Sequence, residues 1–341
     1  MLAMIQSGYG GPEALALTRL PDPVPASDDV VIQVTACALN RLDALQLAGP
    51  AIIPGFALPH IGGMDIGGEI VAVGSKVTHV RLGDRVVVDP AVCCGTCMNC
   101  RNGMDGYCVR LRVIGGNAPG GFAQLTSVPA SAVHKAPEGL SLDDAVALPT
   151  AWSIAWHVTR CVAAVQPGEF TVVTGAAGAV GSAVVQLASH AGARVIALAS
   201  SPRKRALATT LGAEKACAIA SAADLVRDQT NGRGADLVLD CTGATTWDIG
   251  SDCLRLGGRI VTFGNVGGDR VTLSLARLYH RGIRILGAGA YCGTDFRAVL
   301  GAFVGHGLRV VRGSAYPLAE LPVAYSTMLS RDQIGKVVVV P

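Results

Sequence analysis

The spacing of apolar residues changes at about residue 140. From residue 30 to about 88, short apolar runs (VVIQV, GEIVAVG and DRVVV) are separated by Gly, Pro and Asp, a pattern typical of strands joined by turns. Beyond it, apolar strands such as FTVVTG and RVIALAS alternate with helical segments such as GAVGSAVVQLASHAG. Short apolar strands between amphipathic helices predict a parallel sheet covered on both faces. The predicted fold class is α/β, with a β-rich first half and a doubly wound second half.

A glycine-rich turn lies between the first strand and the first helix of the second half. It reads GAAGAVG and spans residues 175–181. Small residues there let the backbone approach a pyrophosphate, and the helix N-terminus supplies amide donors and a positive dipole. A turn that serves only helix–strand packing is the alternative, but the position inside a βαβ unit favours a dinucleotide site. The residues expected to contact the cofactor are Gly178, Ala179, Val180 and Gly181.

The end of the next strand indicates which dinucleotide binds. An acidic residue there would bind the ribose hydroxyls of NAD, whereas this chain has SSPRKR at residues 200–205. Hydroxyls and cations suit the 2′-phosphate of NADPH, because each can donate charge-assisted hydrogen bonds to its oxygens. A solvated basic helix turn is the alternative, but cations oppose the dipole at a helix N-terminus. We therefore predict NADPH, bound through Ser200, Arg203 and Lys204.

Four cysteines follow a C-x2-C-x2-C-x7-C spacing: Cys94, Cys97, Cys100 and Cys108. One loop can thereby direct four thiolates at a common point, as structural zinc requires. A bacterial iron–sulfur motif has a shorter last gap and a following proline, and a disulfide framework is expected of short secreted chains. Reduced thiols on a mobile loop are the remaining alternative. We predict one structural Zn²⁺ in a lobe at about residues 90–112.

Composition narrows the class of protein. Half of the 341 residues are hydrophobic and 16% are charged, as in a globular protein with a large core. The net charge is +3 without a dense basic run, which argues against nucleic-acid binding. The chain lacks both an apolar stretch of about 18 residues and the features of a signal peptide at its start. We expect a cytoplasmic enzyme without a membrane span.

Several short motifs occur in a fixed order along the chain. Besides the cysteines and the glycine-rich turn, they are LNRLD at residues 39–43, GGMDIGG at 62–68, GDRV at 83–86, GGFA at 120–123 and IGKVV at 334–338. Together they make the chain resemble the medium-chain dehydrogenase/reductase superfamily over nearly its whole length. Within it, the chain is similar to zinc-lobe-bearing members close to the quinone oxidoreductases.

This resemblance implies two domains. A GroES-like catalytic domain would comprise residues 1–125 and 290–341, and a Rossmann domain residues 126–289. Thr150 and Gly264 are added to the residues expected to contact the cofactor. The resemblance also implies a small-molecule electrophile as substrate and a homodimer or homotetramer.

The resemblance aligns Asn40, Met64 and Thr150 with the Cys, His and Cys ligands of the catalytic zinc in alcohol dehydrogenases. An amide, a thioether and a hydroxyl make a poor zinc site. We therefore expect hydride transfer from NADPH to an activated C=C bond or a quinone, with hydrogen bonds stabilising the charge on the conjugated oxygen. The alternatives are a carbonyl reductase or alcohol dehydrogenase and, from another class, a non-catalytic NADPH-binding or structural protein.

Four residues are candidates for catalysis. Asn40 can donate to a substrate oxygen, and Asp43 and Asp65 can relay a proton. Tyr291 follows the last Rossmann strand and can supply a hydroxyl. Each has a structural alternative as well, namely a turn cap for Asn40, a salt bridge or turn bond for the two carboxylates, and a core position for the tyrosine.

Overall fold

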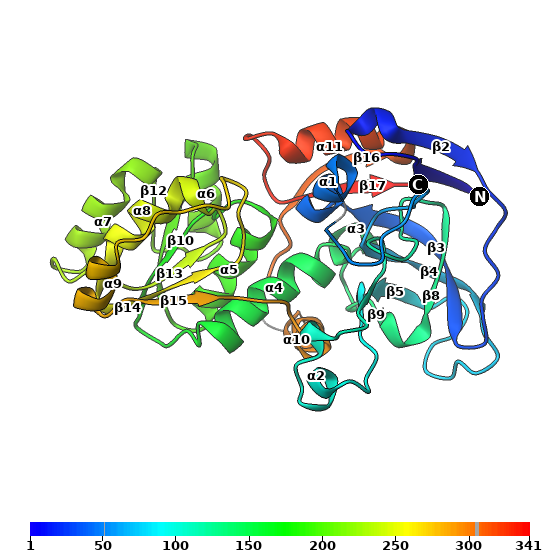
Figure 1. Cartoon of the computed structure of the whole chain (residues 1–341), viewed down its shortest axis with the longest axis horizontal. Helices are drawn as coiled ribbons and strands as arrows, with labels where there is room; N and C mark the ends of the chain where they lie inside the picture. The colour runs from blue at the N-terminus through cyan, green and yellow to red at the C-terminus, as the bar shows by residue number, and fades with distance from the viewer. Residues whose placement is uncertain (51, 304–306) are drawn as a thin grey trace. The chain divides into compact units, whose positions relative to one another are not determined.

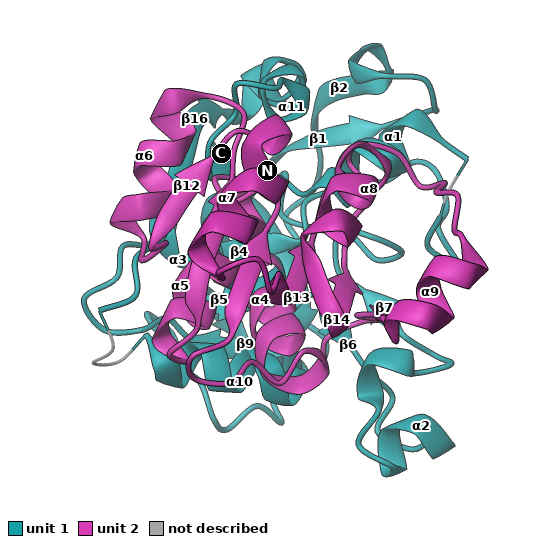
Figure 2. Cartoon of the chain, turned by 90° about the vertical axis from the view of Figure 1, so that its left-hand side faces the viewer, with its two compact units in different colours: residues 1–150, 292–341 teal, residues 151–291 magenta. Residues whose placement is uncertain are grey.

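The computed structural model describes residues 1–50, 52–303 and 307–341, which form two compact units (Figure 2). Unit 1 comprises residues 1–150 and 292–341, and unit 2 comprises residues 151–291. The sequence placed the first domain boundary after residue 125. The structure keeps residues 126–150 in unit 1, because strands β8 (Leu125–Pro129) and β9 (Val133–Lys135) pair with β3 (Asp29–Ala38) and β5 (Arg85–Val88).

Unit 1 is built on one sheet in the order β16-β17-β3-β4-β5-β9, with β8 paired to β3. All neighbouring strands are antiparallel except β16 and β17, which lie side by side in parallel next to α11 (Figure 1). The remaining elements are β1 (Leu2–Gln6), β2 (Leu15–Arg19), β4 (Asp65–Val73), β6 (Ala91–Val92), β7 (Arg112–Val113), β16 (Arg312–Pro317), β17 (Lys336–Val340), α1 (Arg41–Ala48), α2 (Met98–Arg101), α3 (Leu142–Ala145), α10 (Gly293–Ala302) and α11 (Leu321–Leu329).

The register of this sheet brings distant parts of the chain to one edge. Ala38 at the end of β3 lies opposite Asp65 at the start of β4 and opposite Val338 in the middle of β17. Because both pairings are antiparallel, the C-terminal end of β3 meets the N-terminal ends of β4 and β17. Asn40 follows β3 and Lys336 begins β17, so both lie near Asp65.

The glycines of the GGMDIGG motif allow close packing in unit 1. A Cβ on Gly63, whose φ is +93°, would lie 2.8 Å from the Cys37 Sγ, and a Cβ on Gly68 would lie 2.1 Å from the Gln33 carbonyl oxygen. Larger residues at these positions would push β4 away from β3. The motif therefore brings the start of β4 close to the end of β3.

Unit 2 is a six-stranded parallel sheet in the order β12-β11-β10-β13-β14-β15. The chain order reverses between β10 and β13, which is the switch point where doubly wound sheets bind ligands. Its elements are β10 (Phe170–Val173), β11 (Arg194–Leu198), β12 (Lys215–Cys217), β13 (Ala235–Asp240), β14 (Leu254–Thr262), β15 (Arg284–Gly287), α4 (Ser153–Trp156), α5 (Ala179–His190), α6 (Pro202–Thr210), α7 (Ala222–Gln229), α8 (Ala244–Cys253) and α9 (Leu275–Arg281). The predicted fold class is confirmed.

Two helices of unit 2 were not anticipated. Helix α8 lies between β13 and β14. Its sequence, ATTWDIGSDC, is rich in residues with low helix propensity, and the helix is held instead by burial of Trp247 in the core. Helix α9 has no buried residue at all. Among the described helices, none is long and apolar enough to cross a membrane.

Candidate active site

Four polar side chains converge at the edge of the unit 1 sheet. The Asp65 carboxylate is fully buried and lies 2.7 Å from the Lys336 ammonium, which is 3% exposed. It also accepts a 3.0 Å hydrogen bond from the Asn40 Nδ2, one of 2.5 Å from the Thr150 hydroxyl, and one of 3.1 Å from the Thr150 amide. The carboxylate thus has a full set of donors and a counter-ion, as a buried charge requires.

Asn40 bridges the two charges of this cluster. Its Oδ1 accepts a hydrogen bond from the Lys336 ammonium, and its Nδ2 donates to Asp65. Asn40 is 8% exposed, and its second N–H has no partner in the part of the chain that the structure describes. The side chain therefore retains one donor.

Asp43 closes the first turn of α1. Its Oδ2 accepts a 2.7 Å hydrogen bond from the Asn40 backbone amide, as the third-position carboxylate of a capping box does. Its Oδ1 lies 3.4 Å from the Gly63 amide. Of the two interpretations that the sequence allowed for Asp43, this geometry matches the turn bond.

Burial changes the acidity of Asp43. Desolvation raises the pKa of this carboxyl to about 7, against the lowering effects of the Asn40 amide and the Lys336 charge. Tyr325 is buried close by on α11, and its pKa is raised well above the usual value by desolvation and by the Asp43 and Cys37 charges. At neutral pH the tyrosine is therefore neutral and Asp43 is close to its midpoint.

Two positions that align with ligands of a catalytic zinc belong to the Asp65 cluster instead. Asn40 and Thr150, two of the three positions aligned with zinc ligands, both bind Asp65, and Met64 is buried beside it in the chain. An amide, a hydroxyl and a thioether are weak ligands for Zn²⁺. In addition, the Lys336 ammonium already neutralises Asp65, so a divalent cation would meet a like charge. These residues do not fit a catalytic zinc.

Lys336 was not among the residues that the sequence singled out, because its motif served only to mark the family. A signal was present, since Lys336 directly precedes the four-valine run of β17. A charged side chain at the start of a buried strand requires a buried partner of opposite charge.

The fourth candidate for catalysis, Tyr291, belongs to unit 2, where it is buried.

The four predicted zinc ligands lie together in unit 1. Their Sγ atoms all lie within 4.8 Å of one another. The Cys94 and Arg110 amides donate to the Cys108 Sγ at 3.3 and 3.4 Å, and the Arg110 guanidinium donates to the Cys94 Sγ at 3.4 Å. Four sulfurs surrounded by donors fit a closed tetrahedral metal site.

The thiols of this lobe differ in acidity. Hydrogen bonds from the Thr96 amide and the Arg110 guanidinium lower the pKa of Cys94 to about 5, whereas desolvation and the hydrogen bond with Cys97 raise the pKa of Cys100 to about 12. Four thiolates this close therefore require a cation to be ionised together. The four sulfurs therefore fit Zn²⁺ as ligands, and the positive charge of the ion would allow all four to be ionised together.

The glycine-rich turn of unit 2 has the geometry of a dinucleotide site. Gly175 has a φ of +58°, and a Cβ on Gly181 would lie 2.1 Å from the Gly175 carbonyl oxygen, so these two glycines are required by the fold. A Cβ on Gly178, the N-cap of α5, would meet only the Gly175 oxygen, at 3.4 Å. The space above Gly178 is open, as close approach of a pyrophosphate requires.

The segment predicted to bind a 2′-phosphate starts α6. Ser201 caps the helix by accepting a 3.3 Å hydrogen bond from the Lys204 amide, and the Arg205 guanidinium binds the Ala199 and Ser200 carbonyls. Ser200 and Arg203 are exposed, and the first turn of α6 contains no acidic residue. Both side chains are thus available to an anion.

Gly264, a further residue expected to contact the cofactor, lies against Cys241, since a Cβ on Gly264 would be 2.4 Å from the Cys241 carbonyl oxygen.

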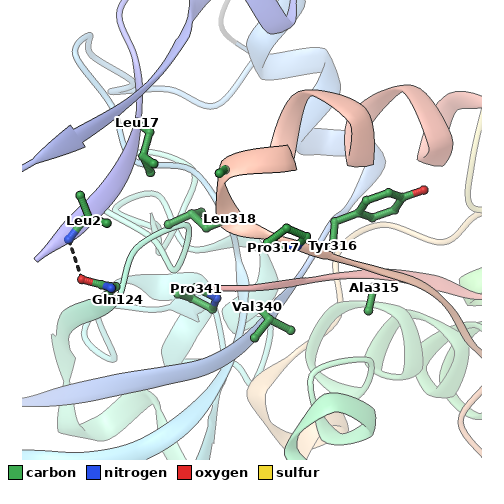
Figure 3. Close-up of a pocket in the computed structure, with 10 residues that line it drawn as sticks. Leu2, Leu17, Gln124, Ala315, Tyr316, Pro317, Leu318, Val340 and Pro341 are labelled. Carbon is green, nitrogen blue, oxygen red and sulfur yellow. Dashed lines mark hydrogen bonds between the residues drawn. The ribbon is translucent and has the colours of Figure 1, made fainter.

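An apolar groove of about 480 Å³ lies elsewhere in unit 1 (Figure 3). It contains Gln124 and Tyr316 as its polar side chains and shares no residue with the Asp65 cluster. Its lining residues are Leu2, Leu17, Gln124, Ala315, Tyr316, Pro317, Leu318, Ala319, Val340 and Pro341.

Comparison with known families agrees with the class that this fold and site define. Residues 26–138 match the alcohol dehydrogenase GroES-like domain, and residues 179–304 match the zinc-binding dehydrogenase family. The chain belongs to the medium-chain dehydrogenase/reductase family and is an oxidoreductase that uses a nicotinamide dinucleotide.

Individual relatives cover essentially the whole chain. An acryloyl-coenzyme A reductase of Metallosphaera sedula is 30% identical, with 99% of each chain covered. A probable quinone oxidoreductase of Schizosaccharomyces pombe is 29% identical over 98% of this chain and 95% of its own length. A crystal structure of a NAD-dependent alcohol dehydrogenase superposes with a TM-score of 0.96 at 33% identity, covering 100% of both chains.

Proposed function

We propose that this protein is an NADPH-dependent reductase that transfers hydride to an activated C=C bond or a quinone without a catalytic metal. The observation that carries the proposal is the Asn40–Asp65–Lys336 cluster, in which Asn40 stands at a position aligned with a ligand of a catalytic zinc. Two of the relatives are named for reduction of an enoyl thioester and of quinones. The proposed substrate class is therefore a conjugated carbonyl compound.

The residues of the cluster have separate tasks in this reaction. NADPH, when bound, supplies the hydride, which adds to the β-carbon of the substrate. The π-electrons move to the conjugated oxygen as an enolate, and the free Asn40 N–H donates to that oxygen. The α-carbon then takes a proton from water. Asp65 holds Asn40 in place and is itself bound by Thr150, and Asp43 caps the helix that Asn40 begins.

The preference for NADPH rests on the start of α6. Ser200, Arg203 and Lys204 are proposed to bind the 2′-phosphate, while Gly178, Ala179, Val180 and Gly181 contact the pyrophosphate. Thr150 and Gly264 are proposed as further cofactor contacts.

The cysteine lobe is proposed to hold one structural Zn²⁺ per chain through Cys94, Cys97, Cys100 and Cys108. A site with four thiolates has no open position, so the metal stabilises the lobe and takes no part in turnover.

A homo-oligomer is proposed through the edge of the unit 2 sheet. Strand β15 is an outer strand, and the adjoining α9 exposes Leu275 (71%) and Tyr279 (68%). A second copy of the chain would cover both. Mass measurement by light scattering should give a dimer or tetramer, and Leu275→Asp should shift it toward the monomer.

One assay tests the reaction. Consumption of NADPH is followed with quinones, enones, enoyl thioesters, aldehydes and ketones, and NADH serves as the control. Turnover of conjugated acceptors supports the proposal, and turnover confined to aldehydes or ketones would replace it by a carbonyl reductase. Binding of NADPH without any turnover would indicate a non-catalytic protein.

A further inference from the structure

Lys336 occupies an unusual position for a lysine. It begins β17 with only 3% of its surface exposed, and its ammonium is bound by Asp65 and Asn40. Lysine is rarely buried to this extent, because its charge must be removed from water. The simplest explanation is an ion pair that fastens β17 to β4.

The contact between Lys336 and Asn40 indicates a second role for the lysine. An amide side chain can adopt two orientations that exchange its oxygen and nitrogen. In the observed one, the Asn40 Oδ1 faces the ammonium and the Nδ2 faces the carboxylate. A flip would place the NH₂ group against the ammonium and the carbonyl against the carboxylate, so both contacts would become repulsive. The ion pair therefore fixes the direction of the amide.

This direction determines what Asn40 can offer a ligand. Its oxygen is used by Lys336, one N–H is used by Asp65, and the second N–H has no partner among the described residues. An amide held this way keeps its NH₂ group, and with it the unused N–H, available to donate to an oxygen that gains negative charge. The opposite charges of Lys336 and Asp65 also cancel, so this pair adds no net negative charge that would repel an enolate.

We propose that Lys336 is a positioning residue of the active site, whose ammonium holds the Asn40 amide as a preorganised donor for the substrate oxygen. The inference rests on the proposed function, since it assumes a conjugated oxygen as the group that Asn40 serves. It gives the lysine of the IGKVV motif a direct consequence for catalysis.

The test is a pair of substitutions measured singly and together with the reductase assay. Asn40→Ala should lower kcat roughly 100-fold, as loss of one oxyanion donor does. Lys336→Met should lower kcat about 10- to 100-fold through misdirection of the amide, with KM for NADPH within about twofold of wild type. In the Asn40→Ala background, Lys336→Met should have no further effect on kcat, and Lys336→Arg should retain most of the activity.

A purely structural lysine would behave differently. Lys336→Met would then lower Tm while kcat of the folded enzyme stayed unchanged, or would lower kcat equally in both backgrounds, and either result overturns the inference. Arg259→Met is the control, because it breaks the ion pair between buried Arg259 and half-buried Glu169 of unit 2 and should affect Tm but not kcat.

Two further measurements keep the test decisive. If Lys336→Met does not fold, the uncharged combination of Asp65→Asn with Lys336→Met replaces it, with Asp65→Asn alone as reference. The inference then requires that the double variant has a lower kcat than Asp65→Asn, and equal kcat values refute it.

Failure of the proposed function and failure of this inference give different results. If wild-type enzyme reduces no conjugated acceptor, the proposed function has failed. If wild-type enzyme reduces one and the Lys336 variants have the same kcat, only the role of Lys336 has failed.

Discussion

The substitution Asp43→Asn isolates the effect of one buried carboxyl on folding. Asn keeps an oxygen that can accept the bond from the Asn40 amide but carries no charge. A carboxyl whose pKa is about 7 when folded and 3.8 when unfolded binds its proton more tightly in the native state. Its contribution to stability is therefore fully present below about pH 4 and is lost as the pH rises through 7.

The size of the effect follows from this shift. Roughly three pKa units at about 1.4 kcal/mol each correspond to about 4 kcal/mol over the whole range, of which about 3 kcal/mol falls between pH 5 and 8. The free energy of unfolding of wild type, measured by urea denaturation, should fall by this amount relative to the Asp43→Asn variant across that window. Other titrating groups cancel in the difference, because both proteins contain them.

The same measurement can refute the reasoning. A difference between the two proteins that is independent of pH would show that Asp43 has the same pKa in the folded and unfolded states. A difference of the opposite slope would mean that the Asn40 amide and the Lys336 charge outweigh desolvation.

Four other changes have defined outcomes. Elemental analysis should find about one zinc per chain, and Cys97→Ser should remove it; two zincs would contradict the assignment of the aligned ligand positions. Replacing Arg203 and Lys204 by Ala should raise KM for NADPH at least roughly tenfold and leave KM for NADH unchanged. Gly181→Ala should lower stability by about 1–3 kcal/mol, because its Cβ would lie 2.1 Å from a carbonyl oxygen. Gly178→Ala should fold normally and bind NADPH more weakly in a fluorescence titration; unchanged binding would remove the turn from the cofactor site.

Much of the fold was accessible from local patterns. Strands such as β3 and β10 are apolar runs bounded by turn residues, and the glycine-rich segment at residues 175–181 follows β10 and leads into α5, as predicted. Helix α8 was not accessible, because its residues have low helix propensity and the core around Trp247 stabilises it. Local composition therefore predicted many strands and the first turn of unit 2, whereas α8 depends on tertiary burial that composition does not reveal.

The site could be predicted only in part for a related reason. Asn40 and Asp65 were singled out by motif, and the structure joins them at 3.0 Å. Lys336 is 296 residues from Asn40 in the chain, and their contact depends on β17 pairing with β3. Periodicity reveals that a strand exists but not which strand it pairs with.

The chemical groups of the cluster predict which substrates the site supports. A catalytic zinc lowers the pKa of a bound alcohol and so prepares it for oxidation. The Asn40 amide cannot accept that proton, and the Lys336 ammonium is already bound to Asp65. The same amide can donate to an oxygen that becomes negative as hydride arrives, which is the situation during reduction of a conjugated carbonyl.

Turnover with primary or secondary alcohols and NADP⁺ should therefore be at least roughly 100-fold slower than reduction of the best enone or quinone by NADPH. Both rates are measured on one enzyme preparation with its zinc content determined beforehand. Comparable rates with the two kinds of substrate would show that the cluster activates alcohols, because an amide that only donates to the substrate oxygen cannot remove the alcohol proton.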